Sequence, residues 1–191
     1  PAEFMAGNMS RCINDITKIT KLMSECQAMG IPCLGPDVNE SQRKFSANKK
    51  GEVRFGLSAI KGMGDAAAVN IIAEREKNGP YKDIFDFIQR VNLSAVNRKA
   101  LESLALSGGF DSFGIKREQY FAQNVKGDTF IETILRYGQV YQTEQSSMQN
   151  SLFGDMGGIE ITTPPVPNCE PWSTMEQLKK ERELVGIYLS A

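Results

Sequence analysis

The stretch from Ile60 to Ala68 carries the clearest chemical signal in the sequence. It holds two glycines separated by one residue, and because a glycine has no Cβ atom, the backbone of such a turn can approach a ligand closely. The helix expected to follow would expose unpaired N–H groups at the positive end of its dipole, which suits a phosphate oxygen. We therefore predict a helix-hairpin-helix whose phosphate contacts come from Lys61, Gly62, Met63, Gly64 and Asp65, with Met63 also packed into the core below.

A glycine pair can also simply form a tight turn between packed helices, and this structural explanation stays open. The surroundings favour phosphate binding, since Ile60 precedes the pair and an apolar helix face follows it. Residues 42–61 contain six basic side chains and one acidic, a net charge of +5, whereas residues 128–191 contain nine acidic and four basic, or −5. The overall charge of −1 is thus the sum of a basic and an acidic stretch, and we expect the protein to have one basic and one acidic surface.

A second pair of helices, expected at residues 84–91 and 95–106, repeats this arrangement with Asn92-Leu93-Ser94 as its link. Residues without a neighbouring acid flank the link: Arg90, Asn97, Arg98 and Lys99. We expect Arg98 and Lys99 to contact the second strand of a duplex, although core packing alone explains this pair equally well. Such contacts hold the nucleic-acid backbone without reading bases, so binding should tolerate any sequence and weaken with salt.

The composition argues against catalysis within this chain. It has no histidine, which removes the usual general base, the histidine-activated nucleophiles and the commonest zinc ligand. Asp83 and Asp86 are the nearest pair of carboxylates to the hairpin, and they look like surface positions of an amphipathic helix. The four cysteines form no C-x-x-C pair and are expected to be free thiols in a reducing cytoplasm. We expect no catalytic residue, metal site or cofactor here.

The pattern predicts a mainly α fold: a small helical bundle with tandem helix-hairpin-helix motifs, one short β-hairpin and a flexible linker. Residues 15–29 should form an amphipathic helix, with Ile16 on its apolar face and Gly30 at its end. A β-hairpin is expected to end in a strand at Val53-Arg54-Phe55. Further helices are expected at residues 57–60, 65–77, 117–125, 129–138 and 175–184. No stretch reaches the roughly 20 apolar residues of a membrane span, and we expect a cytoplasmic protein.

Several separated segments resemble one protein family: Pro1-Ala2-Glu3-Phe4-Met5-Ala6, Gly30-Ile31, Pro36-Asp37-Val38-Asn39-Glu40-Ser41, Arg54-Phe55-Gly56-Leu57 and Gly108-Gly109-Phe110-Asp111. They are similar to the alpha subunit of bacterial DNA polymerase III, a replicative polymerase of the C family. The resemblance implies an internal segment of a longer enzyme, whose Mg²⁺-dependent aspartates would lie upstream in a palm domain. Its implied partners are duplex DNA, a sliding clamp and other replicase subunits.

The resemblance also implies a division of the chain. The parts are residues 1–50 as the helical end of the fingers with a linker, 51–115 as the tandem helix-hairpin-helix domain, 116–138 as supporting helices, 139–168 as a linker, and 169–191 as a connector to an OB-fold domain. The family carries a clamp-binding peptide of the form Q-x-x-L-F between these last domains, and Gln149, Leu152 and Phe153 match it. A linker hydrophobe tucked onto its own domain is the plainer alternative.

Two other functions stay open. A base-excision glycosylase also uses a helix-hairpin-helix, and it needs a catalytic Asp or a nucleophilic Lys near the hairpin, for which Asp65 and Lys61 are the candidates. Helix capping and phosphate contact explain both residues without catalysis. A structural spacer without DNA contact is the third possibility, and the basic stretch before the hairpin argues against it.

Overall fold

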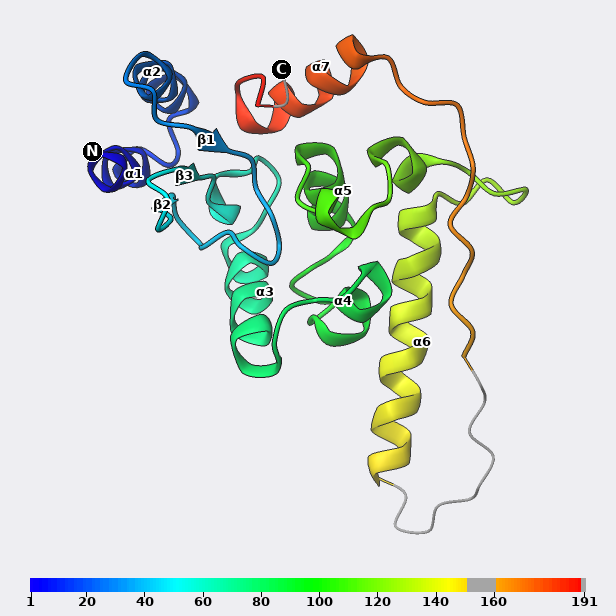
Figure 1. The fold of residues 1–191 in the computed structure, drawn as a ribbon. Coiled ribbons are helices and arrows are strands. Elements are labelled where there is room, and N and C mark those ends of the chain that lie inside the picture. The colour runs from blue at the N-terminus through cyan, green and yellow to red at the C-terminus, as the bar shows by residue number, and fades with distance from the viewer. Residues whose placement is uncertain (151–160, 190–191) are drawn as a thin grey trace.

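The computed structural model describes residues 1–150 and 161–189 and confirms the mainly α fold (Figure 1). The helices are α1 (Ala2–Arg11), α2 (Ile16–Ala28), α3 (Asp65–Asn78), α4 (Ile84–Arg90), α5 (Arg98–Ser107), α6 (Phe130–Asn150) and α7 (Thr174–Val185), with short 3-10 helices η1 (Leu57–Ala59), η2 (Asp111–Phe113) and η3 (Arg117–Phe121). The strands are β1 (Cys33–Leu34), β2 (Ser46–Ala47) and β3 (Val53–Arg54). Among the described helices, none combines the length and apolarity that crossing a bilayer requires.

The helix expected at residues 15–29 is α2, and its ends follow from local chemistry. The side chain of Asp15 accepts a hydrogen bond from the amide of Lys18 at 3.1 Å, which caps the N-terminus. Gly30 takes a left-handed backbone at φ +69° after the C-terminus. Ile16, however, is 44% exposed rather than on the buried face. It lies against Gly186, where an added Cβ would come within 2.3 Å of its side chain.

A small sheet stands between the first two helices and the hairpin region. Its strand order is β1-β3-β2, with β3 antiparallel to β2 and parallel to β1. The predicted β-hairpin is therefore confirmed as β2–β3, and Gly51 supplies the positive φ of its turn. The parallel partner β1 was not predicted, because a two-residue strand leaves no periodic pattern in the sequence.

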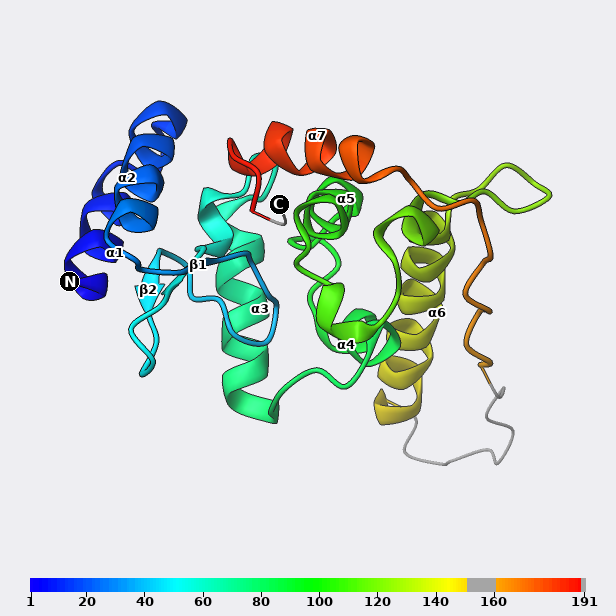
Figure 2. The ribbon, with the colours of Figure 1, turned by 45° about the horizontal axis from the view of Figure 1, so that its top comes forward.

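One core joins α3, α4, α5 and α6. Its centre is aromatic: Phe87 and Phe110 lie 5.1 Å apart between ring centroids, and Phe110 and Tyr120 lie 5.5 Å apart. Each of these rings is at most 1% exposed. Helix α7 covers α5 from outside this core, as Figure 2 shows, and Val185 at its end is fully buried. The region expected as a connector thus contains a helix that packs on the bundle.

Three boundaries differ from the predictions. Helix α6 was expected to end at Gly138, with a linker from residue 139, but it continues to Asn150. It begins at Phe130, one residue later than predicted, and Thr129 caps it: Thr129 Oγ1 accepts from the amide of Glu132, and Glu132 Oε2 accepts from the amide of Thr129. The helix expected over residues 117–125 is only the 3-10 helix η3.

Candidate nucleic-acid interface

The predicted hairpin is present between η1 and α3. The amide of Met63 donates to the carbonyl of Ile60 at 3.0 Å, which closes the turn. Met63 is only 7% exposed, and Ala67 and Ala68 on α3 are buried as well. The prediction that Met63 packs into the core below the turn is confirmed.

The two glycines of the turn have different surroundings. Gly62 has φ +87°, and a Cβ atom there would lie 2.6 Å from Ser103 Oγ and 3.3 Å from Lys99 Cε. The fold itself therefore demands glycine at this position. Gly64 has an ordinary φ of −70°, and a Cβ atom there would meet nothing within 4 Å. No contact within the described structure excludes a side chain at residue 64, and glycine is itself a favoured N-cap residue.

The first turn of α3 presents amides to solvent. Gly64 is its N-cap, and as a glycine it supplies no capping side chain. Within residues 1–150 and 161–189, no acceptor is hydrogen-bonded to the amides of Gly64, Asp65 or Ala66, and all three residues are exposed. These N–H groups, together with the positive end of the dipole of α3, form an open site for an anion.

Two of the predicted lysines flank this site. The side chain of Lys61 is exposed, while its backbone amide donates to the carbonyl of Leu184 at the end of α7 at 3.0 Å. Lys99 reaches the site from α5, with its aliphatic chain within 4 Å of the position that a Cβ on Gly62 would occupy. Lys99 thus lies beside the first hairpin, whereas the sequence had associated it with the second.

The side chain of Asp65 is held by two hydrogen bonds from within the protein. Its Oδ1 accepts hydrogen bonds from Arg43 Nε at 2.6 Å and from Ser58 Oγ at 2.9 Å. The bond from Arg43, followed by the bond from Ser58, lowers the pKa of this carboxyl group. Asp65 is therefore an ionised acceptor that ties the segment around Arg43 to the start of α3.

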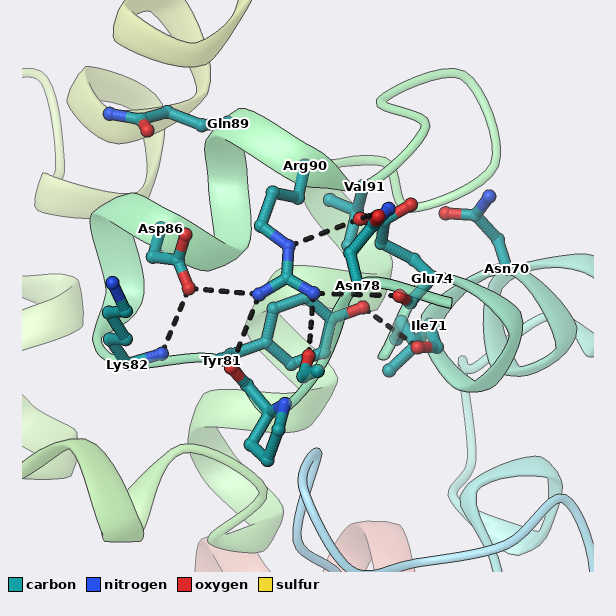
Figure 3. Close-up of polar contacts among 12 residues, drawn as sticks. Asn70, Ile71, Glu74, Asn78, Tyr81, Lys82, Asp86, Gln89, Arg90 and Val91 are labelled. Carbon is teal, nitrogen blue, oxygen red and sulfur yellow. Dashed lines mark hydrogen bonds and ion pairs between the residues drawn. The ribbon is translucent and has the colours of Figure 1, made fainter. Parts of the chain in front are cut away.

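The expectation that the second hairpin carries unpaired cations is wrong for Arg90. Its guanidinium donates to Glu74 at 3.1 Å, to Asp86 at 3.0 Å and to the carbonyl of Gly79 at 2.6 Å, as Figure 3 shows. It also lies 4.5 Å from the ring centroid of Tyr81. Arg90 joins α3 to α4 and is only 17% exposed, so its function is structural.

Arg98 and Asn97 also have hydrogen-bond partners within the protein. Arg98 donates to Glu102 at 2.8 Å and to Glu132 of α6 at 2.5 Å. The side chain of Asn97 accepts from the amide of Ala100 at 3.1 Å and caps α5, which begins three residues later than predicted. The α5 N-terminus is therefore already capped, and of the predicted second-hairpin contacts Lys99 lies next to Gly62 of the first hairpin.

The other sequence candidates have local structural explanations. Asp83 accepts from the amide of Asp86 at 2.7 Å and caps α4, while Asp86 pairs with Arg90. All four cysteines are free thiols, and burial raises the pKa of Cys33 to about 12. Within the described residues, no three His, Cys, Asp or Glu side chains group together in a metal-binding arrangement.

The clamp-binding match falls largely beyond the described structure. Gln149 belongs to the last turn of α6, but its side chain lies outside the described part, as do Leu152 and Phe153. The basic residues that sequence reasoning did not single out are Arg43 and Lys44. Their membership of the +5 stretch was the available signal, yet only the fold places Arg43 against Asp65.

The fold and the exposed helix start define the chain as a helix-hairpin-helix protein, and residues 30–120 match the helix-hairpin-helix motif family. Along its whole length the chain is 35% identical to DNA polymerase III subunit alpha of Haemophilus influenzae, 36% identical to that of Treponema pallidum and 36% identical to that of Thermus aquaticus. It spans 16%, 16% and 14% of those proteins, respectively. Over its whole length the chain thus corresponds to one segment of bacterial DNA polymerase III alpha subunits.

Proposed function

We propose that this segment holds the sugar-phosphate backbone of duplex DNA, without sequence specificity, within a replicative DNA polymerase. The observation that carries the proposal is the open start of α3, where the amides of Gly64, Asp65 and Ala66 are exposed and uncapped. The names of the relatives support the polymerase context. Contacts from backbone amides to phosphates carry no base information, which agrees with a positioning role.

The charge around the site supports the same function. Lys61 and Lys99 flank the bare amides, and neither has an ion-pair partner among the described residues. Amides and lysines together neutralise phosphate charge and release counterions, so the affinity should fall steeply as salt rises. The stretch that leads into the hairpin, residues 42–61, carries six basic side chains against one acidic, a net charge of +5.

The experiment compares two glycines that both have open space around them. Gly64→Leu places a side chain over the amides, whereas Gly7→Leu places one on the exposed surface of α1, where a Cβ atom also meets nothing within 4 Å. Binding of a labelled duplex of arbitrary sequence is measured by fluorescence anisotropy at several salt concentrations. Gly64→Leu should weaken binding by about tenfold or more, since at least one charge-assisted hydrogen bond is removed, and Gly7→Leu should not.

The proposal fails if Gly64→Leu binds duplex as tightly as Gly7→Leu while both remain folded by circular dichroism. A strong preference for one sequence would contradict it as well, because contacts to phosphates carry no base information. The salt dependence of binding should also be shallower for Gly64→Leu than for the wild type. The slope should fall by about 0.9 for each phosphate group that the variant no longer neutralises.

We further propose that Gln149, Leu152 and Phe153 tether the segment to a sliding clamp. The support is the sequence match together with its position after the long helix α6, whose last turn contains Gln149. A Leu-Phe pair on a polar segment suits insertion into an apolar pocket of a partner. Leu152→Ala with Phe153→Ala should abolish binding to a purified clamp in a pull-down and leave duplex affinity unchanged. Undiminished clamp binding by this double variant would place the interaction elsewhere.

Glycosylase activity has less support. Both hydrogen bonds to Asp65 engage its Oδ1, and the lowered pKa of this carboxyl group makes it a weak base. Incubation with a duplex that contains a damaged base or an abasic site distinguishes the two functions. Strand cleavage that disappears in Lys61→Ala would favour the repair enzyme.

A further inference from the structure

We infer that Arg43 is a further contact for the DNA backbone and that Asp65 is the residue that positions it. The inference rests on the proposed binding of duplex at the hairpin, and it adds to that site a side chain from a segment 22 residues upstream of Asp65. It follows from how Arg43 is fixed, from the donors it retains and from the hollow that it lines.

The backbone of Arg43 is held rigidly beside the hairpin. Its carbonyl accepts from the amide of Ser58 at 3.0 Å, and the carbonyl of Gln42 accepts from the amide of Leu57 at 2.9 Å. Gly56 packs directly against this segment, because a Cβ atom there would lie 2.8 Å from the carbonyl oxygen of Arg43. The start of the side chain of Arg43 is thus fixed relative to η1 and the turn.

The far end of the side chain is fixed as well. Nε of Arg43 donates to Asp65 Oδ1 at 2.6 Å, and Ser58 Oγ donates to the same oxygen at 2.9 Å. Only Nε is used in this way: in the described part of the chain, no acceptor is hydrogen-bonded to the two terminal nitrogens of the guanidinium. The side chain is 53% exposed. An arginine that offers two parallel terminal donors matches the oxygens of one phosphate group.

The position of Arg43 links it to the hairpin site. Arg43, Lys44, Ser58, Met63 and Asp65 line one hollow of about 330 Å³, whose other walls come from the link between α1 and α2. Met63 is the central residue of the Gly-x-Gly turn, and Asp65 is the first residue of α3. The guanidinium therefore stands at the edge of the exposed amides, where the backbone of a bound duplex would continue.

Asp65 lies in the first turn of α3, where a carboxylate stabilises the helix dipole, but it also lies beside the proposed phosphate site. A carboxylate beside a phosphate site repels the ligand, and removing it should then strengthen binding. If Asp65 positions Arg43, its removal should weaken binding because the guanidinium loses its preferred orientation. The two explanations predict opposite signs for Asp65→Asn, and this difference makes the inference testable.

The experiment measures duplex affinity and its salt slope for Arg43→Ala, Arg43→Lys, Asp65→Asn and the double variant Arg43→Ala with Asp65→Asn. The exposed pair Arg136 and Asp128 on and before α6 gives matched controls, Arg136→Ala and Asp128→Asn. Arg43→Ala should weaken binding about three- to fivefold and reduce the salt slope by about 0.9. Arg43→Lys should weaken binding while leaving the slope unchanged, since the charge remains but the paired donors are absent.

Asp65→Asn should weaken binding in the wild-type background and should not weaken it when Arg43 is already Ala. The inference is overturned if Arg43→Ala binds no differently from Arg136→Ala, or if Asp65→Asn strengthens binding to the wild-type chain. The proposed function fails separately, through an undiminished affinity of Gly64→Leu. If Gly64→Leu weakens binding and Arg43→Ala does not, only the role of Arg43 is wrong.

Discussion

The substitution Gly62→Ala tests the finding that the fold, and not the ligand, requires glycine at this position. The new Cβ atom would lie 2.6 Å from Ser103 Oγ and 3.3 Å from Lys99 Cε, on a backbone with φ +87°. A left-handed conformation costs a residue with a Cβ atom about 1–2 kcal/mol. Overpacking against a close neighbour costs about 1–3 kcal/mol more. The sum is a loss of about 2–5 kcal/mol in the free energy of unfolding.

A loss of this size is readily measured. For a chain of this length, 1 kcal/mol shifts the midpoint of thermal unfolding by about 2–4 °C, so Gly62→Ala should lower it by roughly 4–20 °C. Urea unfolding followed by circular dichroism gives the same quantity as a free energy. A second variant separates the two causes: Ser103→Ala in the Gly62→Ala background removes the Oγ atom and should recover only the part of the loss that comes from overpacking.

Gly64→Ala is the matched control, because residue 64 has an ordinary φ and open space for a Cβ atom. It should lower the free energy of unfolding by no more than about 1 kcal/mol, because alanine is a poorer N-cap than glycine and no steric clash adds to that cost. The reasoning is refuted if Gly62→Ala unfolds like the wild type, or if Gly64→Ala is destabilised as strongly.

Two further predictions concern buried polar groups, and both are checked by urea unfolding. Tyr120→Phe should keep or raise the free energy of unfolding, by about 1 kcal/mol, because the Tyr120 hydroxyl is buried without a hydrogen-bond partner in the described structure; a loss above that size would reveal an unrecognised partner. Glu181→Gln should cost about 2–4 kcal/mol, because Glu181 is 1% exposed and Arg117 Nη1 donates to it at 3.0 Å; an unchanged stability would mean that this pair does not hold α7 in place.

The parts of the fold that the sequence predicted are those determined by neighbouring residues. The turn at Gly62, the end of α2 at Gly30 and the hairpin of β2 and β3 each depend on residues within a few positions. Backbone conformation and capping are local, so residue type and spacing reveal them.

The wrong predictions concern features that depend on residues far apart in the sequence. Arg98 was expected to have no neighbouring acid, but it pairs with Glu102 and with Glu132, which lies 34 residues away. Residues 139–150 were expected to form a linker because their composition is polar. They are helical, and Gln142 there donates to the carbonyls of Ile88, Gln89 and Val91 at the end of α4. A side chain that caps another helix leaves no periodic signal in its own segment.

The candidate site also has features that the sequence predicts and features that only the fold determines. The glycine turn and Lys61 could be predicted, because the motif is contiguous. The different surroundings of Gly62 and Gly64 could not be predicted. Gly62 packs against Ser103 of α5, whereas residue 64 has open space around it in the described structure. The position of Arg43 beside Asp65 also depends on the way the segment before β2 packs against η1.

The central claim is that uncapped backbone amides at the start of α3 bind phosphate oxygens of a duplex. At 21.1 kDa the chain suits NMR spectroscopy, and each amide can be followed separately while unlabelled duplex is added. The account predicts that the amide resonances of Gly64, Asp65 and Ala66 move most, and that added salt reverses the change. Resonances that move elsewhere on the chain, while these three stay where they were, would contradict it.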